Sequence, residues 1–442
     1  MSSVESIRTS VRESGYCWKS CLEMSRRSLA LLACGFASWV QAETLTLDQA
    51  LKMAEEGHPR LQAGVAQWKA AGAATRTARA FPNPEAGALA GTQTTRIPGN
   101  AAGSVYSFSL TQPLDFGPTR SSRIEIADRN LEGSYAALDL VRNEVLSDVR
   151  RAFFESLRRQ SEMELLLESL RLVEDLRQRI QVRVGVGEAG RLELVRADAE
   201  VATARASANA ARLDWTSAIA RLRAATGVVH EEEIQVQGTF ESAGPLEPLP
   251  EIRQRVLEKH PSLRQARAEV ARARAKIRHE RSLRIPTPSL RAEIDRPPDT
   301  PTYRFGLSLP LPLWDRRSGP IAEATAQLSQ AEALLRNQEM QLHSALVGAY
   351  GRFQSAGEQL TAFEQGIVRE AEEALKASEL AFQLGERGIL EVLDAQRVLR
   401  TVRLQFLIAR YDRQLALVDI NELKATALVA DAATAVSADS KK

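Results

Sequence analysis

Aromatic residues, cysteines and long apolar runs are scarce in this chain. Phe, Trp and Tyr together make up 5% of its 442 residues, and its three cysteines, Cys17, Cys21 and Cys34, lie near the N-terminus. After residue 42 no segment approaches the ~20 apolar residues that a membrane helix requires. The formal net charge is only +2, which argues against nucleic-acid binding, because that function needs a strongly basic surface. A chain of this kind that crosses a membrane must do so with strands.

The N-terminal segment has the pattern of a secretory signal peptide. Arg26 and Arg27 precede an apolar stretch that ends in Val40-Gln41-Ala42, a sequence that fits a signal-peptidase site. We therefore predict a signal peptide over residues 1–42. Its removal would take away every cysteine together with five basic and three acidic residues, so that the net charge falls from +2 to about zero. The exported chain would then have no disulfide and no thiol ligand for a metal.

Two alternatives concern this same segment. Met24 offers an internal start, which would make residues 1–23 an N-terminal extension. Leu31-Leu32-Ala33-Cys34 loosely resembles a lipoprotein cleavage box, so lipidation of Cys34 competes with cleavage after Ala42.

An internal repeat with an offset of about 200 residues organises the rest of the chain. His58-Pro59 returns as His260-Pro261, the block YSFSLTQPLDF returns as YRFGLSLPLPL, and VGEAGRLELVRA returns as LGERGILEVLDA. Each copy reads as helix, strand pair, long helix, turn and helix. The first copy begins with a helical pattern from about Thr46 to Arg79, which Phe81-Pro82-Asn83-Pro84 ends because proline cannot continue a helix.

The repeat predicts an elongated body of two fused halves. The expected segments are a first repeat over 43–227 (strands about 85–112, long helices about 119–184 and 191–226), a linker over 228–250, a second repeat over 251–425 (strands about 288–309, long helices about 318–384 and 390–424) and a flexible tail over 426–442. Apolar residues recur every seven positions along the long helices, as Leu166, Val173 and Ile180 do, and this spacing favours coiled-coil packing.

The strands alternate between an apolar and a polar face. The residues predicted to face lipid are Tyr106, Phe108 and Leu110 in the first copy and Tyr303, Phe305 and Leu307 in the second. Four strands cannot close a barrel, since ~8 is the practical minimum, and open strand edges are costly in a bilayer. Four strands per chain therefore imply assembly, and three chains would supply twelve. The alternative is a pair of ordinary amphipathic hairpins packed on a soluble core.

No catalytic constellation and no cofactor motif is recognisable, so we predict neither enzymatic activity nor a bound cofactor or metal. The two glycine-rich turns are more informative. Each would form the tip of a helical hairpin on which a partner's helical hairpin could dock; a simple chain reversal without a partner is the alternative. The predicted docking residues are Gly187, Glu188 and Gly190 in the first tip and Gly385, Glu386 and Gly388 in the second.

Acidic residues follow the second tip. Glu391 and Asp394 are three residues apart and share one helix face. In a three-fold assembly they would supply six carboxylates near the axis, and such a ring favours cations. Arg387 would belong to a clasp that holds this mouth closed. A solvated helix face is the plainer interpretation of the same pattern.

The whole pattern resembles the TolC family of outer-membrane efflux ducts, and within it the CzcC-like heavy-metal efflux subgroup. The residues that carry the resemblance are Phe81–Pro84, Gln112–Gly117, Leu309–Arg316 and the two tips. The resemblance implies a mainly α-helical TolC-like homotrimer with a 12-stranded outer-membrane β-barrel above a long periplasmic α-helical barrel. It also implies docking to a periplasmic adaptor protein and an inner-membrane RND pump. In this family pattern Glu391, Asp394 and Glu193 occupy acidic gate positions, and Arg387 occupies that of the clasp.

The resemblance thus favours a passive exit duct for heavy-metal cations in the outer membrane, extending into the periplasm. A duct for drug efflux or type I protein secretion is an alternative of the same class. A soluble periplasmic coiled-coil scaffold is the alternative from another class, and it predicts no strands and no outer-membrane fractionation.

Overall fold

The computed structural model describes residues 43–94, 101–115, 117–227, 234–240 and 246–425. The predicted signal peptide, the cysteines within it and the predicted flexible tail over 426–442 lie outside the described residues.

Strands and helices of the first repeat follow one another in the predicted order. They are β1 (Glu43–Leu45), α1 (Leu47–Gly57), α2 (Pro59–Arg79), β2 (Glu85–Gln93), β3 (Gly103–Pro113), α3 (Pro118–Gly185) and α4 (Arg191–Thr226). The helical pattern expected from Thr46 to Arg79 is divided into α1 and α2 at His58. The physical reason is Pro59, which begins α2, while the His58 side chain caps that helix by accepting a hydrogen bond from the Arg60 amide at 3.1 Å.

The second repeat has the same order with one interruption. β4 (Ile234–Val236) lies in the segment predicted as the linker. The elements that follow it are α5 (Leu249–Lys259), α6 (Pro261–Ser282), β5 (Ser289–Arg296), β6 (Thr302–Ser308), α7 (Ser318–Ala362), η1 (Phe363–Ile367), α8 (Val368–Gln383) and α9 (Ile389–Leu423). The continuous helix predicted over 318–384 is therefore wrong in its middle. At η1 the chain makes a π-helical turn around Gly366, a kind of bulge that kinks a helix. The matching region of α3 continues without a break.

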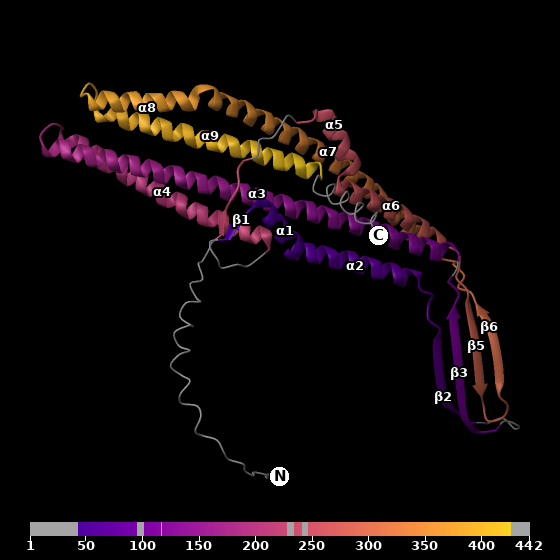
Figure 1. Cartoon of the computed structure of the whole chain (residues 1–442). Coiled ribbons are helices and arrows are strands. Elements are labelled where there is room, and N and C mark those ends of the chain that lie inside the picture. The colour runs from indigo at the N-terminus through magenta and orange to yellow at the C-terminus, as the bar shows by residue number, and fades with distance from the viewer. Residues whose placement is uncertain (1–42, 95–100, 116, 228–233, 241–245, 426–442) are drawn as a thin grey trace, which may run out of the picture. The chain divides into compact units, whose positions relative to one another are not determined.

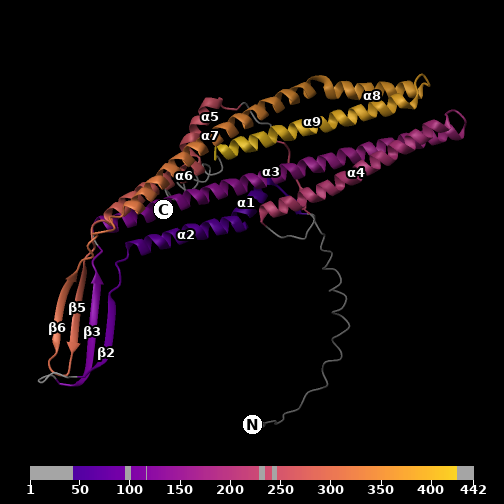
Figure 2. The ribbon, with the colours of Figure 1, turned by 180° about the vertical axis from the view of Figure 1, so that it is seen from behind.

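The long helices lie side by side, with the strands at one end and the hairpin turns at the other (Figures 1 and 2). α3 packs against α2 and α4 of its own repeat and against α6 and α9 of the other repeat. The turn between α3 and α4 and the turn between α8 and α9 lie at the same end in both views. The two repeats are thus joined along most of the length of α3.

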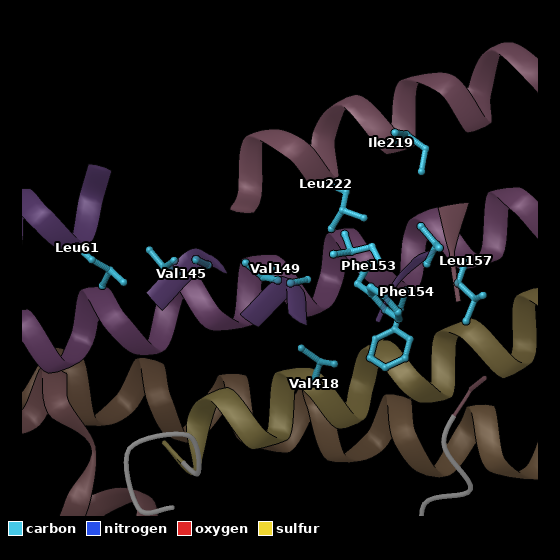
Figure 3. Close-up of a cluster of buried hydrophobic side chains, with 13 residues drawn as sticks. Leu61, Val145, Val149, Phe153, Phe154, Leu157, Ile219, Leu222 and Val418 are labelled. Carbon is cyan, nitrogen blue, oxygen red and sulfur yellow. The ribbon is translucent and has the colours of Figure 1, made fainter. Parts of the chain in front are cut away.

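The largest apolar cluster lies where α3, α4 and α9 meet (Figure 3). Phe153 and Phe154 of α3 pack edge to face with ring centroids 5.6 Å apart, and Leu222 of α4 and Val418 of α9 cover them. Further along α4 most of the buried side chains are alanines, such as Ala204 and Ala208, which allow close helix packing.

Strands β2, β3, β5 and β6 form an antiparallel sheet in that order, so that β3 and β5 join the two repeats. The short strands β1 and β4, which the sequence pattern did not indicate, pair with each other. Among the helices of the described residues, none is both long enough and apolar enough to cross a membrane.

Candidate functional site

One face of the four-stranded sheet is apolar from edge to edge. The strand register places Ala88, Phe108, Ile294 and Tyr303 in one row across the sheet. The next row contains Ala86, Leu110, Ala292 and Phe305, and Leu290 pairs with Leu307 beyond it. The large side chains in these rows are exposed, with Phe305 at 84% and Leu307 at 65%. A soluble protein rarely leaves a continuous apolar surface of this kind uncovered, so the face is adapted to an apolar surrounding.

The opposite face of the same sheet is polar. Glu293 lies opposite Arg304 on β6 and Ser109 on β3. The Ser107 hydroxyl lies 3.4 Å from Glu293 Oε1, and Arg304 forms an ion pair with Asp295. All six residues predicted to face lipid are therefore on one face. Glu293, Asp295 and Arg304 are on the other, whereas Arg296, at the end of β5, lies opposite Tyr106 on the apolar face.

Both hairpin tips close by the same hydrogen-bond pattern. At the first tip the Glu188 amide donates to Arg183 O at 2.9 Å, and the Gly187 amide donates to Val184 O at 3.2 Å. At the second tip the Glu386 amide donates to Ala381 O at 2.9 Å, with Gly385 in the place of Gly187. This is the Schellman motif, which needs a residue with positive φ. Gly187 has φ +81° and Gly385 has φ +77°, so the fold itself requires these two glycines.

The second glycine of each tip has a different position. Gly190 and Gly388 are the N-cap residues of α4 and α9, with φ −76° and −80°, values that any residue adopts. A Cβ added at Gly190 would meet no atom within 4 Å, and one at Gly388 would meet only the Glu391 carboxylate at 3.4 Å. The conformation of the chain therefore does not explain why glycine stands at these two positions.

The predicted acidic gate residues lie at the start of α9, each near an arginine of the same helix end. Glu391 Oε1 is 3.9 Å from Arg387 Nη1, and Asp394 Oδ1 is 4.0 Å from Arg397 Nη1. Both carboxylates are exposed, Asp394 at 71% of its side chain. Glu193 lies in the first turn of α4, where its charge suits the helix N-terminus. Arg387, the residue predicted to belong to a clasp, is itself two-thirds exposed, and its ion pair with Glu391 lies within the second tip.

A different ion pair joins the two repeats here, and the sequence analysis missed it. Glu200 of α4 accepts hydrogen bonds from Arg397 Nη2 at 3.0 Å and Arg400 Nη1 at 3.5 Å, both on α9. Only 12% of the Glu200 side chain is exposed. The available signal was weak: a glutamate among the alanines of α4, with its partners about 200 residues away.

Apolar packing and a groove accompany this ion pair. Ile180, Ala197, Ile389 and Val392 belong to one buried cluster between the hairpins, and the Arg183 guanidinium stacks on the Phe382 ring, 4.8 Å from its centroid. Between α3 and α8 lies a groove of about 470 Å³, whose charged lining residues are Asp175, Arg179, Arg183, Glu188 and Glu379.

Other polar groups have structural roles. The His260 side chain caps α6 by accepting a hydrogen bond from the Ser262 amide at 3.2 Å, and burial lowers the pKa of His260 to about 4. Among the described residues, no group of three or more His, Cys, Asp or Glu side chains is arranged to hold a metal ion.

Comparison with known proteins agrees with this arrangement. The model of the family described as "Outer membrane efflux protein" matches residues 50–228 and 252–426. The cobalt-zinc-cadmium resistance protein CzcC of Cupriavidus metallidurans is 29% identical over 368 residues, which are 83% of this chain and 86% of that protein. The nickel-cobalt-cadmium resistance protein NccC of Alcaligenes xylosoxydans xylosoxydans is 28% identical over 322 residues, 72% of each chain.

Solved structures show the same fold at lower identity. The crystal structure of CusC matches with a TM-score of 0.75 at 18% identity, over 86% of this chain and 91% of that one. The open state of the Neisseria gonorrhoeae MtrE outer membrane channel matches with a TM-score of 0.71 at 20% identity, over 86% and 88% of the two chains.

Proposed function

This chain belongs to the outer membrane efflux protein family, and from that membership we propose that it is the exit duct of a tripartite system that exports divalent heavy-metal cations. Its family and fold are those of channel proteins rather than of enzymes. In the proposal, three chains assemble so that their sheets close a 12-stranded barrel in the outer membrane, while their long helices form a tunnel in the periplasm. A periplasmic adaptor and an inner-membrane RND pump complete the system, and the pump supplies the energy.

The exposed apolar face of the sheet is the observation that carries this proposal. Lipid would cover Phe108, Phe305 and Leu307, while Glu293 and Arg304 would face a water-filled lumen. The edges at β2 and β6 present unpaired backbone groups, each of which costs several kcal/mol in hydrocarbon. Pairing with further copies removes both edges, which supports assembly.

The cargo is inferred from two relatives and from the charge at the tips. CzcC and NccC are named for resistance to cobalt, cadmium, zinc and nickel. Glu391 and Asp394 are exposed at the tip of α9, where three chains would place six carboxylates around the tunnel mouth and favour cations. These two residues, with Glu193 and Arg387, are the proposed gate.

The adaptor is proposed to dock on the hairpin tips. Gly187 and Gly385 are required for the turns themselves, whereas Gly190 and Gly388 have conformations open to any residue. Glycine at these last two positions is explained if a partner's backbone approaches closely. Glu188 and Glu386, which lie between the two glycines of each tip, would offer the partner a negative charge.

A matched pair of variants tests the membrane assignment. Leu307 and Ser308 are neighbours on β6 whose side chains point to opposite faces. We expect Leu307→Lys to reduce the amount of oligomer in the outer-membrane fraction, because a lysine on the lipid face costs from about 0–1 kcal/mol near the interface to about 2–4 kcal/mol at the bilayer midplane. Ser308→Lys, on the lumen side, should retain it. Equal behaviour of the two variants in a soluble fraction would support a periplasmic scaffold instead.

Deletion of the gene tests the cargo. Tolerance to cobalt, zinc and cadmium should fall, tolerance to drugs should stay unchanged, and the natural sequence supplied in trans should restore metal tolerance. Loss of drug tolerance with intact metal tolerance would instead favour a duct for drug efflux.

A further inference from the structure

The sheet ends in two unpaired edges, and the internal repeat specifies how they are completed. β3 and β6 are equivalent strands, because Tyr106, Phe108 and Leu110 correspond to Tyr303, Phe305 and Leu307 at a constant offset. The hairpin registers then make β2 equivalent to β5, because Ala88 lies opposite Phe108 in the first hairpin as Ala292 lies opposite Phe305 in the second. A pairing of β6 with β2 would therefore be equivalent to the pairing of β3 with β5, and it is not formed within a single chain.

The observed junction between the repeats gives the register of the missing one. Phe108 of β3 lies opposite Ile294 of β5, and the repeat equivalents of these two residues are Phe305 and Ala90. Building on the proposed trimeric duct, we propose that β6 pairs antiparallel with β2 of the next copy of this chain, with Phe305 opposite Ala90 of the partner subunit. In the same register Gly306 lies opposite Leu89 of the partner subunit, and Leu307 opposite Ala88 of the partner subunit.

Side-chain size supports this register independently of the repeat. On the apolar face the large Phe305 and Leu307 would meet alanines. On the polar face Arg304 would meet the partner subunit's Gly91, and the exposed Leu89 would meet the partner subunit's Gly306. A Cβ at Gly91 or Gly306 would touch nothing within 4 Å inside one chain, so both positions have room for a neighbour's side chain.

Other registers lose this fit. A shift by two residues places Gly306 opposite a glycine and Leu89 opposite Arg304 or Ser308. A shift by one residue would turn the apolar face of one subunit toward the polar face of the next, which a sheet with one lipid-facing side does not tolerate. The proposed register is therefore the one in which each large side chain faces a small one and the apolar face continues around the assembly.

Paired cysteines test the register in native membranes. Leu89→Cys with Gly306→Cys places the two thiols directly across the proposed seam. The control, Gly91→Cys with Gly306→Cys, is displaced by two residues, which puts the Cα atoms about 8 Å apart, beyond the ~7 Å limit for a disulfide. After mild oxidation of outer membranes we expect covalent dimers and trimers, roughly tenfold more abundant for the first pair than for the control. The unsubstituted chain, whose own cysteines lie in the predicted signal peptide, gives the background.

A second pair of cysteine substitutions is needed in case the first pair disturbs local folding. Ala90→Cys with Phe305→Cys probes the lipid side of the same seam, and the native mass of each variant is measured alongside. Cross-linking of either matched pair above the control supports the register. Stronger cross-linking of the control, or none in any pair although the native mass is that of a trimer, overturns the register and leaves the proposed duct standing. An unsubstituted chain that forms no oligomer in the outer membrane would overturn the proposed function itself, and the register with it.

Discussion

Replacing Glu200 by glutamine tests whether the ion pair between α4 and α9 holds the two hairpins together. The variant keeps the shape of the side chain and one hydrogen-bond acceptor but removes the charge that faces Arg397 and Arg400. Exposed ion pairs contribute about 0–1 kcal/mol, and breaking a fully buried one costs about 3–5 kcal/mol. Glu200 is 12% exposed, Arg400 19% and Arg397 54%, so we expect an intermediate loss of about 1–2 kcal/mol, nearer to the surface value because Arg397 is largely in solvent.

Native-state hydrogen exchange measures this loss where it should occur. Local opening of the hairpins exposes backbone amides of α4 and α9 near the ion pair. A loss of 1.4 kcal/mol corresponds to a tenfold change in an equilibrium constant, so these amides should exchange roughly tenfold faster in Glu200→Gln than in the natural protein.

The control is Asp198→Asn, two residues away. Asp198 is half exposed and pairs with Arg177 at 2.8 Å inside the first hairpin, without reaching the second repeat. Its loss should change exchange in α9 little. If Glu200→Gln left the exchange of α9 unchanged, or if both variants accelerated it equally, the ion pair would not be what joins the hairpins.

Three further predictions follow from the tips, the helix caps and the gate. Gly187→Ala should lower the free energy of unfolding by about 1–2 kcal/mol, because alanine is strained at positive φ. Gly190→Ala should leave the melting temperature unchanged but weaken capture of the adaptor. Unaltered capture by Gly190→Ala would remove the argument for close docking. Stability should fall by up to about 3 kcal/mol as the pH drops from 6.5 to about 4, because His260 is protonated at a higher pH in the unfolded chain than in the folded one. His260→Asn keeps a good N-cap residue and should reduce this acid sensitivity in thermal melts. An unchanged pH profile would contradict the role of His260 in the acid sensitivity. Asp394→Ala, alone or with Glu391→Ala, should weaken cation preference and block by multivalent cations in planar-bilayer recordings, and unchanged selectivity would place these carboxylates away from the constriction.

Local patterns were enough to predict most of the elements. Alternation of Tyr106, Phe108 and Leu110 indicated a strand with one apolar face, and β3 has that face. The glycines of VGEAG and LGERG indicated helix reversals, and both tips have them. These signals suffice because strand alternation, proline breaks and positive φ are properties of a few consecutive residues.

The kink at η1 was not predictable from the same patterns. Glycines also occur inside α3, at Gly133, and inside α7, at Gly348, where the helices continue. Gly366 lies in the turn that begins at Phe363, whose ring centroid is 6.0 Å from that of Phe406 on α9. The course of a helix of this length depends on the helices that pack against it, and the local sequence does not specify those contacts.

The sequence by itself determined the repeat, the helices and strands, the two faces of the sheet and the glycine tips, because each is encoded within a short stretch of chain. Only the tertiary structure decided which distant groups meet. It paired β3 with β5 and placed Glu200 against Arg397. It also separated Gly187, which the backbone requires, from Gly190, which it does not. Such choices depend on where the chain returns after some 200 residues, and that path is set by the packing of whole helices against one another.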